Sequence, residues 1–214
     1  MNKIDCLKAM KIQVWKSRHE QNLNSAESDD WRKLQMEVRA CEQCVLHETR
    51  TQVVFGVGNP KSAIMLVGEG PGATEDEEGI PFVGRAGQLL DAMLAAISLD
   101  RTQVYMANIV KCRPPENRNP TKEEIASCTP FLIQQIKLMK PRLIVALGKV
   151  AAQFLLACDE ELIRLRSKKH VLKIASLSEI PVIVTYHPAY LLRAPLDKAK
   201  AWEDLKLIKA HLSQ

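Results

Sequence analysis

Four short apolar runs, each followed by a helical pattern, organise the chain from about residue 63 onward. The runs are apolar almost throughout, rather than alternating with polar residues, and cover residues 63–67, 104–108, 143–147 and 182–186. Such runs are typical of parallel strands that are buried on both faces. We therefore predict a three-layer α/β/α domain, in which helices cover a central parallel sheet of about four strands.

The segments between and after these runs have the periodicity of helices. They cover residues 86–98, 121–139, 149–165 and 197–212. Thr121 and Glu124 have the spacing of a capping box, which marks the start of the second helix. Residues 1–40 read as one or two polar helices with a linker at 22–30, so we predict an N-terminal helical extension (1–40) and one domain (41–214).

Glycine-rich or polar residues stand at the end of every predicted strand. They are the segment 68–72 after the first strand, Asn108 at the end of the second, Gly148 and Lys149 after the third, and the segment 187–191 after the fourth. In a parallel sheet the carboxyl ends of the strands lie along one edge, where ligands bind. The sequence therefore predicts a single binding crevice at this edge.

Composition and charge narrow the class of protein without deciding it. Thirty Lys and Arg against 25 Asp and Glu give a net charge of +5, which permits a polyanionic partner but does not demonstrate one. No apolar run approaches the ~18 residues that span a membrane. The first residues lack the apolar core of a signal peptide, so we expect a cytoplasmic protein without a membrane partner.

The cysteines suggest a metal centre rather than disulfides, which are rare in the reducing cytosol. Six cysteines stand at positions 6, 41, 44, 112, 128 and 158. Cys41 and Cys44 form a C-x-x-C knuckle that presents two thiolates to one metal. Together with Cys112 and Cys128 they can hold zinc or an iron–sulfur cluster, although zinc ribbons use a closer second pair. The alternative is buried free cysteine, which is our interpretation of Cys6 and Cys158.

Three of these strand-end segments, together with a segment that follows the first of them, form a recognisable pattern. The segments are 68–72 (GEGPG), 79–87 (GIPFVGRAG), 108–115 (NIVKCRPP) and 187–193 (HPAYLLR). They resemble the three motifs of the uracil-DNA glycosylase superfamily, and with the cysteines they resemble its iron–sulfur type, family four. The resemblance runs from about Cys41 to the C-terminus. The segment 164–170 (RLRSKKH) departs from the family pattern. The family has a glycine after an arginine here, whereas this segment contains no glycine.

This resemblance implies a monofunctional hydrolase of base excision repair. Such an enzyme flips uracil out of single- or double-stranded DNA, hydrolyses its N-glycosidic bond and leaves an abasic site. The resemblance also implies a monomer with a 4Fe-4S cluster on Cys41, Cys44, Cys112 and Cys128. One branch of the superfamily carries an inserted basic loop with a histidine that traps the sugar, and this chain has no such insertion between Lys111 and Cys128.

The resemblance assigns uracil contacts to residues that also have plain structural interpretations. The predicted uracil-binding residues are Gly68, Glu69, Gly70, Glu75, Phe82, Asn108 and His187. Phe82 would stack on the flipped base, and Glu75 would line the side of thymine's methyl group. Asn108 would read O4 and N3–H of uracil, and His187 would donate to O2. Phe82 can instead be a core residue, and Asn108 and His187 can be turn residues.

Catalysis and DNA binding are assigned in the same way. Better-known uracil glycosylases have an aspartate where this chain has Gly70, so Glu69 is the candidate for activating water, and Glu69 and His187 are the predicted catalytic residues. Lys149 and Arg193 would contact DNA phosphates, unless they are only solvated charges. Leu191 resembles the wedge that enters the base stack, and its alternative is a partly exposed loop leucine.

Two other functions remain open from the sequence. A non-catalytic iron–sulfur DNA-binding module of a replication or repair assembly would use the same scaffold. A nucleotide-binding α/β protein would use the glycines of 68–72 as a phosphate loop, but the segment lacks the Lys-Ser/Thr ending of a P-loop.

Overall fold

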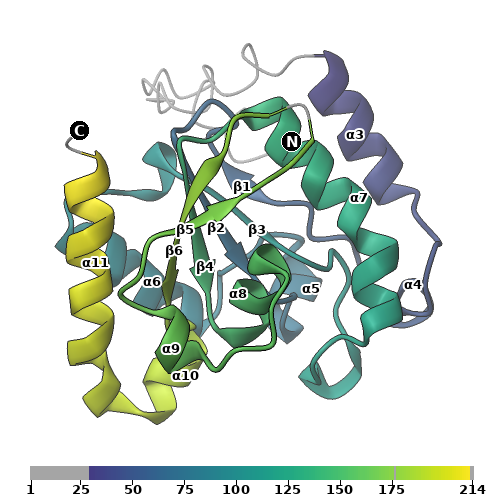
Figure 1. Cartoon of the computed structure of the whole chain (residues 1–214). Helices are drawn as coiled ribbons and strands as arrows, with labels where there is room; N and C mark the ends of the chain where they lie inside the picture. Colours follow the sequence, from purple (N-terminus) through teal and green to yellow (C-terminus); the bar gives the residue numbers. More distant parts are fainter. Residues whose placement is uncertain (1–28, 176, 213–214) are drawn as a thin grey trace, which may run out of the picture.

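The computed structural model describes residues 29–175 and 177–212, and a six-stranded sheet lies at its centre (Figure 1). The strand order is β1-β3-β2-β4-β6-β5. The four inner strands are parallel: β2 (Ile64–Gly68), β3 (Tyr105–Asn108), β4 (Leu143–Leu147) and β6 (Ile180–Thr185). These are the four apolar runs, so the predicted α/β/α fold is confirmed.

Two edge strands were not predicted, and both are antiparallel to their neighbours. β1 (Val57–Gly58) pairs with β3, and β5 (His170–Leu172) pairs with β6. β1 is only two residues long, and β5 has a half-buried, an exposed and a buried residue in turn. Neither segment carries the continuous apolar signal of a strand that is buried on both faces.

Helices cover both faces of the sheet because the inner strands present apolar side chains on both sides. In β2, Met65 and Val67 belong to one core cluster, and Ile64 and Leu66 belong to the other. The first cluster packs under α3 (Asp29–Arg39), α7 (Lys122–Met139) and α8 (Lys149–Leu156); the second packs under α6 (Arg85–Ala96), α10 (Pro188–Arg193) and α11 (Lys198–Leu212). In Figure 1, α11 and α6 lie on one side of the sheet, and α3 and α7 lie on the other.

Shorter elements connect these layers. They are α4 (Leu46–Thr49), α5 (Ala73–Glu78), α9 (Leu162–Leu165) and the 3-10 turns η1 (Arg101–Gln103), η2 (Pro115–Asn117) and η3 (Pro195–Asp197). The helix predicted over 149–165 is wrong, because Ala157 takes a left-handed conformation (φ 49°) and ends α8. The predicted capping box at the start of α7 is confirmed: the Thr121 hydroxyl accepts from the Glu124 N–H at 3.3 Å.

The N-terminal part of the described chain packs on the domain. Trp31, Leu34 and Val38 of α3 are buried, and α3 contacts α7. Residues 1–28 of the predicted extension lie outside the described residues. Among the described helices, none combines the length and the apolar character needed to cross a membrane.

The segment 164–170 is organised by a buried ion pair and a left-handed serine. Arg166 is 7% exposed and its Nε donates to Asp204 Oδ2 of α11 at 2.7 Å. The residue after it, Ser167, has a φ of 59°, in the region that glycine occupies without steric cost. The glycine that the family pattern places after the arginine would therefore occupy a backbone conformation that favours glycine.

We expect Ser167→Gly to stabilise the fold. A left-handed conformation costs a side-chain-bearing residue about 1–2 kcal/mol, and the greater freedom of glycine in the unfolded chain returns part of this, so the gain is about 0.5–1 kcal/mol. The midpoint of thermal unfolding measures it. Ser127→Gly is the matched control, because Ser127 is helical and its replacement should lower the midpoint. A lower midpoint for Ser167→Gly would contradict the expectation.

Candidate active site

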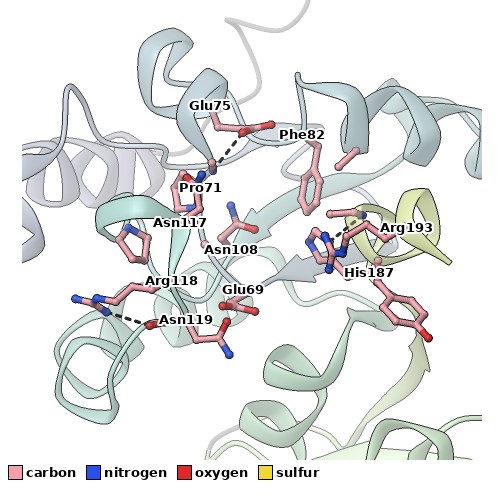
Figure 2. Close-up of a pocket in the computed structure, with 16 residues that line it drawn as sticks. Glu69, Pro71, Glu75, Phe82, Asn108, Asn117, Arg118, Asn119, His187 and Arg193 are labelled. Atoms are coloured by element: carbon pink, nitrogen blue, oxygen red, sulfur yellow. Dashed lines mark hydrogen bonds between the residues drawn. The ribbon is translucent and has the colours of Figure 1, made fainter.

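A cavity of about 450 Å³ opens beyond the carboxyl ends of the parallel strands (Figure 2). The predicted site residues that line it are Glu69, Gly70, Glu75, Phe82, Asn108, His187 and Arg193. In the view of Figure 2, Phe82 and His187 lie on one side of Asn108, and Asn117 and Arg118 lie on the other. Segments that are far apart in the sequence thus meet at the edge of the sheet that the strand-end residues indicated.

Asn108 ends β3 and lines the cavity, and its amide oxygen has no hydrogen-bond partner among the described residues. Its side chain is 3% exposed, and its Oδ1 is the one buried side-chain N or O atom without a hydrogen-bond partner among the described residues. Leaving a buried polar atom unpaired costs about 1–3 kcal/mol, so such an atom in a cavity indicates a ligand that supplies the missing donor. The geometry therefore fits a ligand with an N–H group.

Gly68 lies beside Asn108 in the parallel register of β2 and β3. A Cβ at Gly68 would collide with Asn108 Oδ1 and would lie 2.7 Å from Phe82 Cζ. The backbone of Gly68 itself has no left-handed φ, so only the missing side chain explains the glycine. Its role is to let an amide and an aromatic ring approach β2 closely.

We expect Gly68→Ala to distort the cavity and lower the reaction rate without unfolding the protein. The new methyl group would displace the Asn108 amide and the Phe82 ring, and a misplacement of about 1 Å in a catalytic site can cost about 100-fold in rate. The measurement is the single-turnover rate of the reaction that the resemblance implies, the release of uracil from DNA. The melting midpoint serves as the control for folding, and a variant with normal activity would show that the amide and ring are not held as described.

Phe82 takes an unusual backbone conformation. Its φ is 58°, which is a strained value for an aromatic residue, and its ring centroid lies 6.0 Å from that of His187 at an interplanar angle of 35°. Its carbonyl accepts a hydrogen bond from the Arg101 guanidinium, whose Nε is bound to Asp91 at 2.6 Å. Strained residues of this kind persist only where the surroundings fix them, as occurs at functional sites.

His187 is held as a neutral imidazole with one defined tautomer. Its Nδ1 accepts a hydrogen bond from the Ala189 N–H at 3.2 Å, so the ring proton resides on Nε2. Burial, and secondarily the charge of Arg193, lower the pKa of His187 to about 4. Its Nε2–H group is therefore a neutral hydrogen-bond donor at physiological pH.

The two glutamates of the cavity differ in their environments. Glu75 holds the surrounding loops, because its Oε2 accepts from Gly72 N–H at 3.2 Å and its Oε1 accepts from Val83 and Gly84 N–H at 3.1 Å each. Burial raises the pKa of Glu69 above its ordinary value. A carboxylate that loses hydration in this way is a stronger base than an exposed one, which suits the activation of water.

The three predicted DNA contacts are placed differently. Arg193 lines the cavity. Lys149 does not line it and pairs with Glu161 on the surface at 2.6 Å. Leu191 is 1% exposed and belongs to the core, so the prediction that it enters the base stack is corrected; the exposed apolar side chains of α10 are Tyr190 and Leu192.

The sequence interpretation missed one wall of the cavity. Its residues are Pro114, Asn117, Arg118 and Asn119, from the connection between β3 and α7. Glu116 and Asn117 are both left-handed, with φ of 56°, and Arg118 pairs with the buried Glu124 at 2.6 Å. The run of polar residues after Pro114 was the available signal, but it does not differ from that of an ordinary loop.

A second, small cavity lies among the four predicted cluster ligands. Cys41, Cys44, Cys112 and Cys128 all line it. Arg50 donates to Cys112 Sγ at 3.2 Å, and the Lys111 N–H donates to Cys128 Sγ at 3.3 Å. Among the described residues, no group of three or more His, Cys, Asp or Glu is arranged to hold a single metal ion. Four sulfur donors with positively charged and N–H neighbours suit an anionic iron–sulfur cluster.

Burial makes the thiols of Cys112 and Cys128 unreactive. Burial raises the pKa of Cys112 and raises that of Cys128 to about 11, so both are protonated at neutral pH. Reactive cysteines have lowered values, which excludes a thiolate nucleophile at Cys112 or Cys128. Of the other two cysteines, Cys158 is half-buried beside the core and Cys6 lies outside the described residues.

Comparisons with known proteins identify the family of this chain. The family model of the uracil DNA glycosylase superfamily matches residues 55–206. A type-4 uracil-DNA glycosylase of Pyrobaculum aerophilum is 43% identical over 182 residues, which cover 83% of this chain and 92% of that protein. One of Thermotoga maritima is 44% identical over 179 residues, covering 83% and 92%. The chain belongs to the type-4 uracil-DNA glycosylases.

A relative of another kind shows where this scaffold also occurs. A protein of Bacillus phage SP01 named DNA polymerase is 29% identical over 168 residues, which cover 78% of this chain and only 18% of that protein. The matched part is therefore a small segment of a larger protein.

The match of the superfamily model, over residues 55–206 of this chain, includes every residue named above as lining the larger cavity.

Proposed function

We propose that this protein excises uracil from DNA by hydrolysing the N-glycosidic bond and leaves an abasic site. The observation that carries the proposal is the unpartnered Oδ1 of Asn108 in a cavity bordered by Phe82 and His187. A flipped base presents a ring face for stacking and polar edges for hydrogen bonding, and these residues complement both. Family membership supports the same activity.

Uracil fits the amide of Asn108 in one orientation. Its N3–H group donates to Oδ1, which lacks a donor in the described chain, and its O4 accepts from the amide NH₂. Cytosine presents the reverse pattern, with an acceptor at N3 and a donor at the 4-amino group. Phe82 supplies the stacking surface, and the three backbone bonds of Glu75 hold the adjoining loops.

The chemistry consists mainly of stabilising the departing base. As the glycosidic bond lengthens, negative charge accumulates on uracil, and His187 donates from Nε2 to O2, where that charge develops. A neutral donor serves this purpose without transferring its proton. Glu69, with its raised pKa, accepts a proton from the attacking water, because Gly70 offers no carboxylate.

We propose that Cys41, Cys44, Cys112 and Cys128 hold a 4Fe-4S cluster. Such a cluster supplies structural cross-linking here, because its ligands lie on the knuckle before α4, on the segment after β3 and on α7. Purified protein should be brown and contain close to four irons per chain. Cys112→Ser should reduce the yield of soluble protein. The rate of the protein that stays soluble should change much less. Stoichiometric zinc without iron, in protein prepared without oxygen, would contradict the assignment.

A non-catalytic DNA-binding module is the second candidate, and the similarity to a segment of a phage DNA polymerase favours it. The two functions differ in the fate of the substrate. A labelled oligonucleotide with one uracil should acquire an alkali-sensitive site after incubation with the enzyme, whereas thymine and cytosine controls should not. Binding without an alkali-sensitive site would support the module instead.

A further inference from the structure

Lys111 is a buried cation that the proposed chemistry does not use. It is 1% exposed and is among the largest fully buried side chains of the described chain. An ammonium group in the interior is very costly unless it is hydrogen-bonded, so its contacts indicate what it is retained for. They lead to the floor of the active-site cavity.

The Lys111 ammonium has two well-placed acceptors. Nζ donates to the backbone carbonyl of Asn108 at 2.8 Å and to Gln135 Oε1 at 2.6 Å. Gln135 is itself fully buried, and its Nε2 donates to the Phe55 carbonyl at 3.0 Å and to the Tyr105 hydroxyl at 3.1 Å. These two bonds fix the Gln135 amide so that its oxygen faces Lys111. They thereby set the direction of the hydrogen bonds that connect Lys111 with Gln135 and its partners.

The peptide group after Asn108 is therefore held from both sides. Its N–H, which belongs to Ile109, donates to the Gly68 carbonyl at 2.9 Å, and its carbonyl accepts from Lys111. The Asn108 side chain, by contrast, has an oxygen with no hydrogen-bond partner in the part of the chain that the structure describes. Its direction follows from the backbone that carries it and from its packing against Gly68.

We infer that Lys111 is a positioning residue, which sets the orientation of the uracil-reading amide of Asn108 through the Asn108 carbonyl. This inference rests on the proposed function. Lys111 also joins two parts of the molecule: its main-chain carbonyl accepts from Val54 N–H at 2.8 Å, and its N–H donates to Cys128 Sγ on α7. The lysine thus secures the end of β3 to the helix that carries Gln135 and Cys128.

The test is a double-mutant cycle between Lys111 and Asn108. Lys111→Met keeps the length of the side chain and removes its donors. In the native background it should slow single-turnover uracil release about 10- to 100-fold, within the range of couplings between contacting residues. In the Asn108→Ala background it should slow release by less than about 3-fold, because no reading amide remains to be misplaced.

A binding measurement separates positioning from general damage. DNA with a non-hydrolysable 2′-fluoro-deoxyuridine places a base in the cavity, and DNA with a tetrahydrofuran abasic-site analogue does not. Lys111→Met should weaken binding of the first and leave binding of the second unchanged. Lys122→Met, at an exposed position of α7, is the matched control and should change neither.

The outcomes distinguish the inference from the proposed function. Equal slowing in both backgrounds, or equal loss of affinity for both DNAs, would overturn the positioning role. If Lys111→Met fails to fold, judged by iron content and melting, Gln135→Met decides: it removes one acceptor of Lys111 and should reproduce the non-additivity with Asn108→Ala. A native enzyme that releases no uracil would contradict the proposed function itself, whereas a native enzyme with additive variants contradicts only the inference.

Discussion

Asn108→Asp is expected to reduce uracil excision by about 10⁴-fold, because the carboxylate replaces the donor to O4 with an acceptor. The substitution keeps the size of the side chain, so the cavity shape is retained. Any residual activity should shift toward cytosine, whose 4-amino group donates to the new carboxylate oxygen. Single-turnover rates on uracil and cytosine oligonucleotides of the same sequence measure both effects.

Asn108→Ala is the control for this reversal of hydrogen bonding. It removes both the donor and the acceptor, so uracil excision should fall without any gain on cytosine. The cluster spectrum and the melting midpoint should remain close to those of the native protein, since the side-chain oxygen makes no hydrogen bond within the described chain. Near-normal uracil excision by Asn108→Asp would require a different pocket for the base.

His187→Ala should lower the rate about 100- to 1,000-fold, the usual cost of removing one donor to a developing oxyanion. The loss should fall on the single-turnover rate and leave the affinity for abasic-site DNA nearly unchanged. His187→Gln offers another neutral N–H donor and is expected to retain part of the rate. Equal losses for both substitutions would indicate that the ring contributes by packing rather than by donation.

The pH dependence separates His187 from Glu69. Because the pKa of His187 is lowered to about 4, the imidazole stays neutral and contributes no change in rate between about pH 5 and 8. Glu69 acts as a base only when ionised, and its pKa is raised, so the rate should fall as the pH drops through that raised value. Glu69→Gln should abolish this acid limb. A limb near pH 6.5 that disappears in His187→Gln would instead show that His187 titrates in this range.

The fold was predictable where burial leaves a continuous signal. The inner strands were found because both of their faces are covered, and the capping box at Thr121 located the start of α7. The edge strands and the break at Ala157 were missed for physical reasons. A two-residue strand has no periodicity, and an alanine gives no sequence signal for a left-handed conformation.

The site was predictable to the extent that its residues stand at strand ends. Asn108 and His187 were placed by their strands, whereas the wall around Asn117 belongs to an irregular connection. Leu191 shows a different limit. Position in a motif does not determine which side of a short helix faces the core, and α10 turns Leu191 inward while leaving Leu192 exposed.

The most direct test of the account is to identify the product that leaves the cavity. A uracil-containing oligonucleotide is incubated with the enzyme, and free uracil and abasic sites are counted separately by mass spectrometry. We expect one free uracil for each abasic site, an unbroken DNA backbone before alkali treatment, and no release of thymine or cytosine. DNA that is bound tightly but releases no uracil would contradict it.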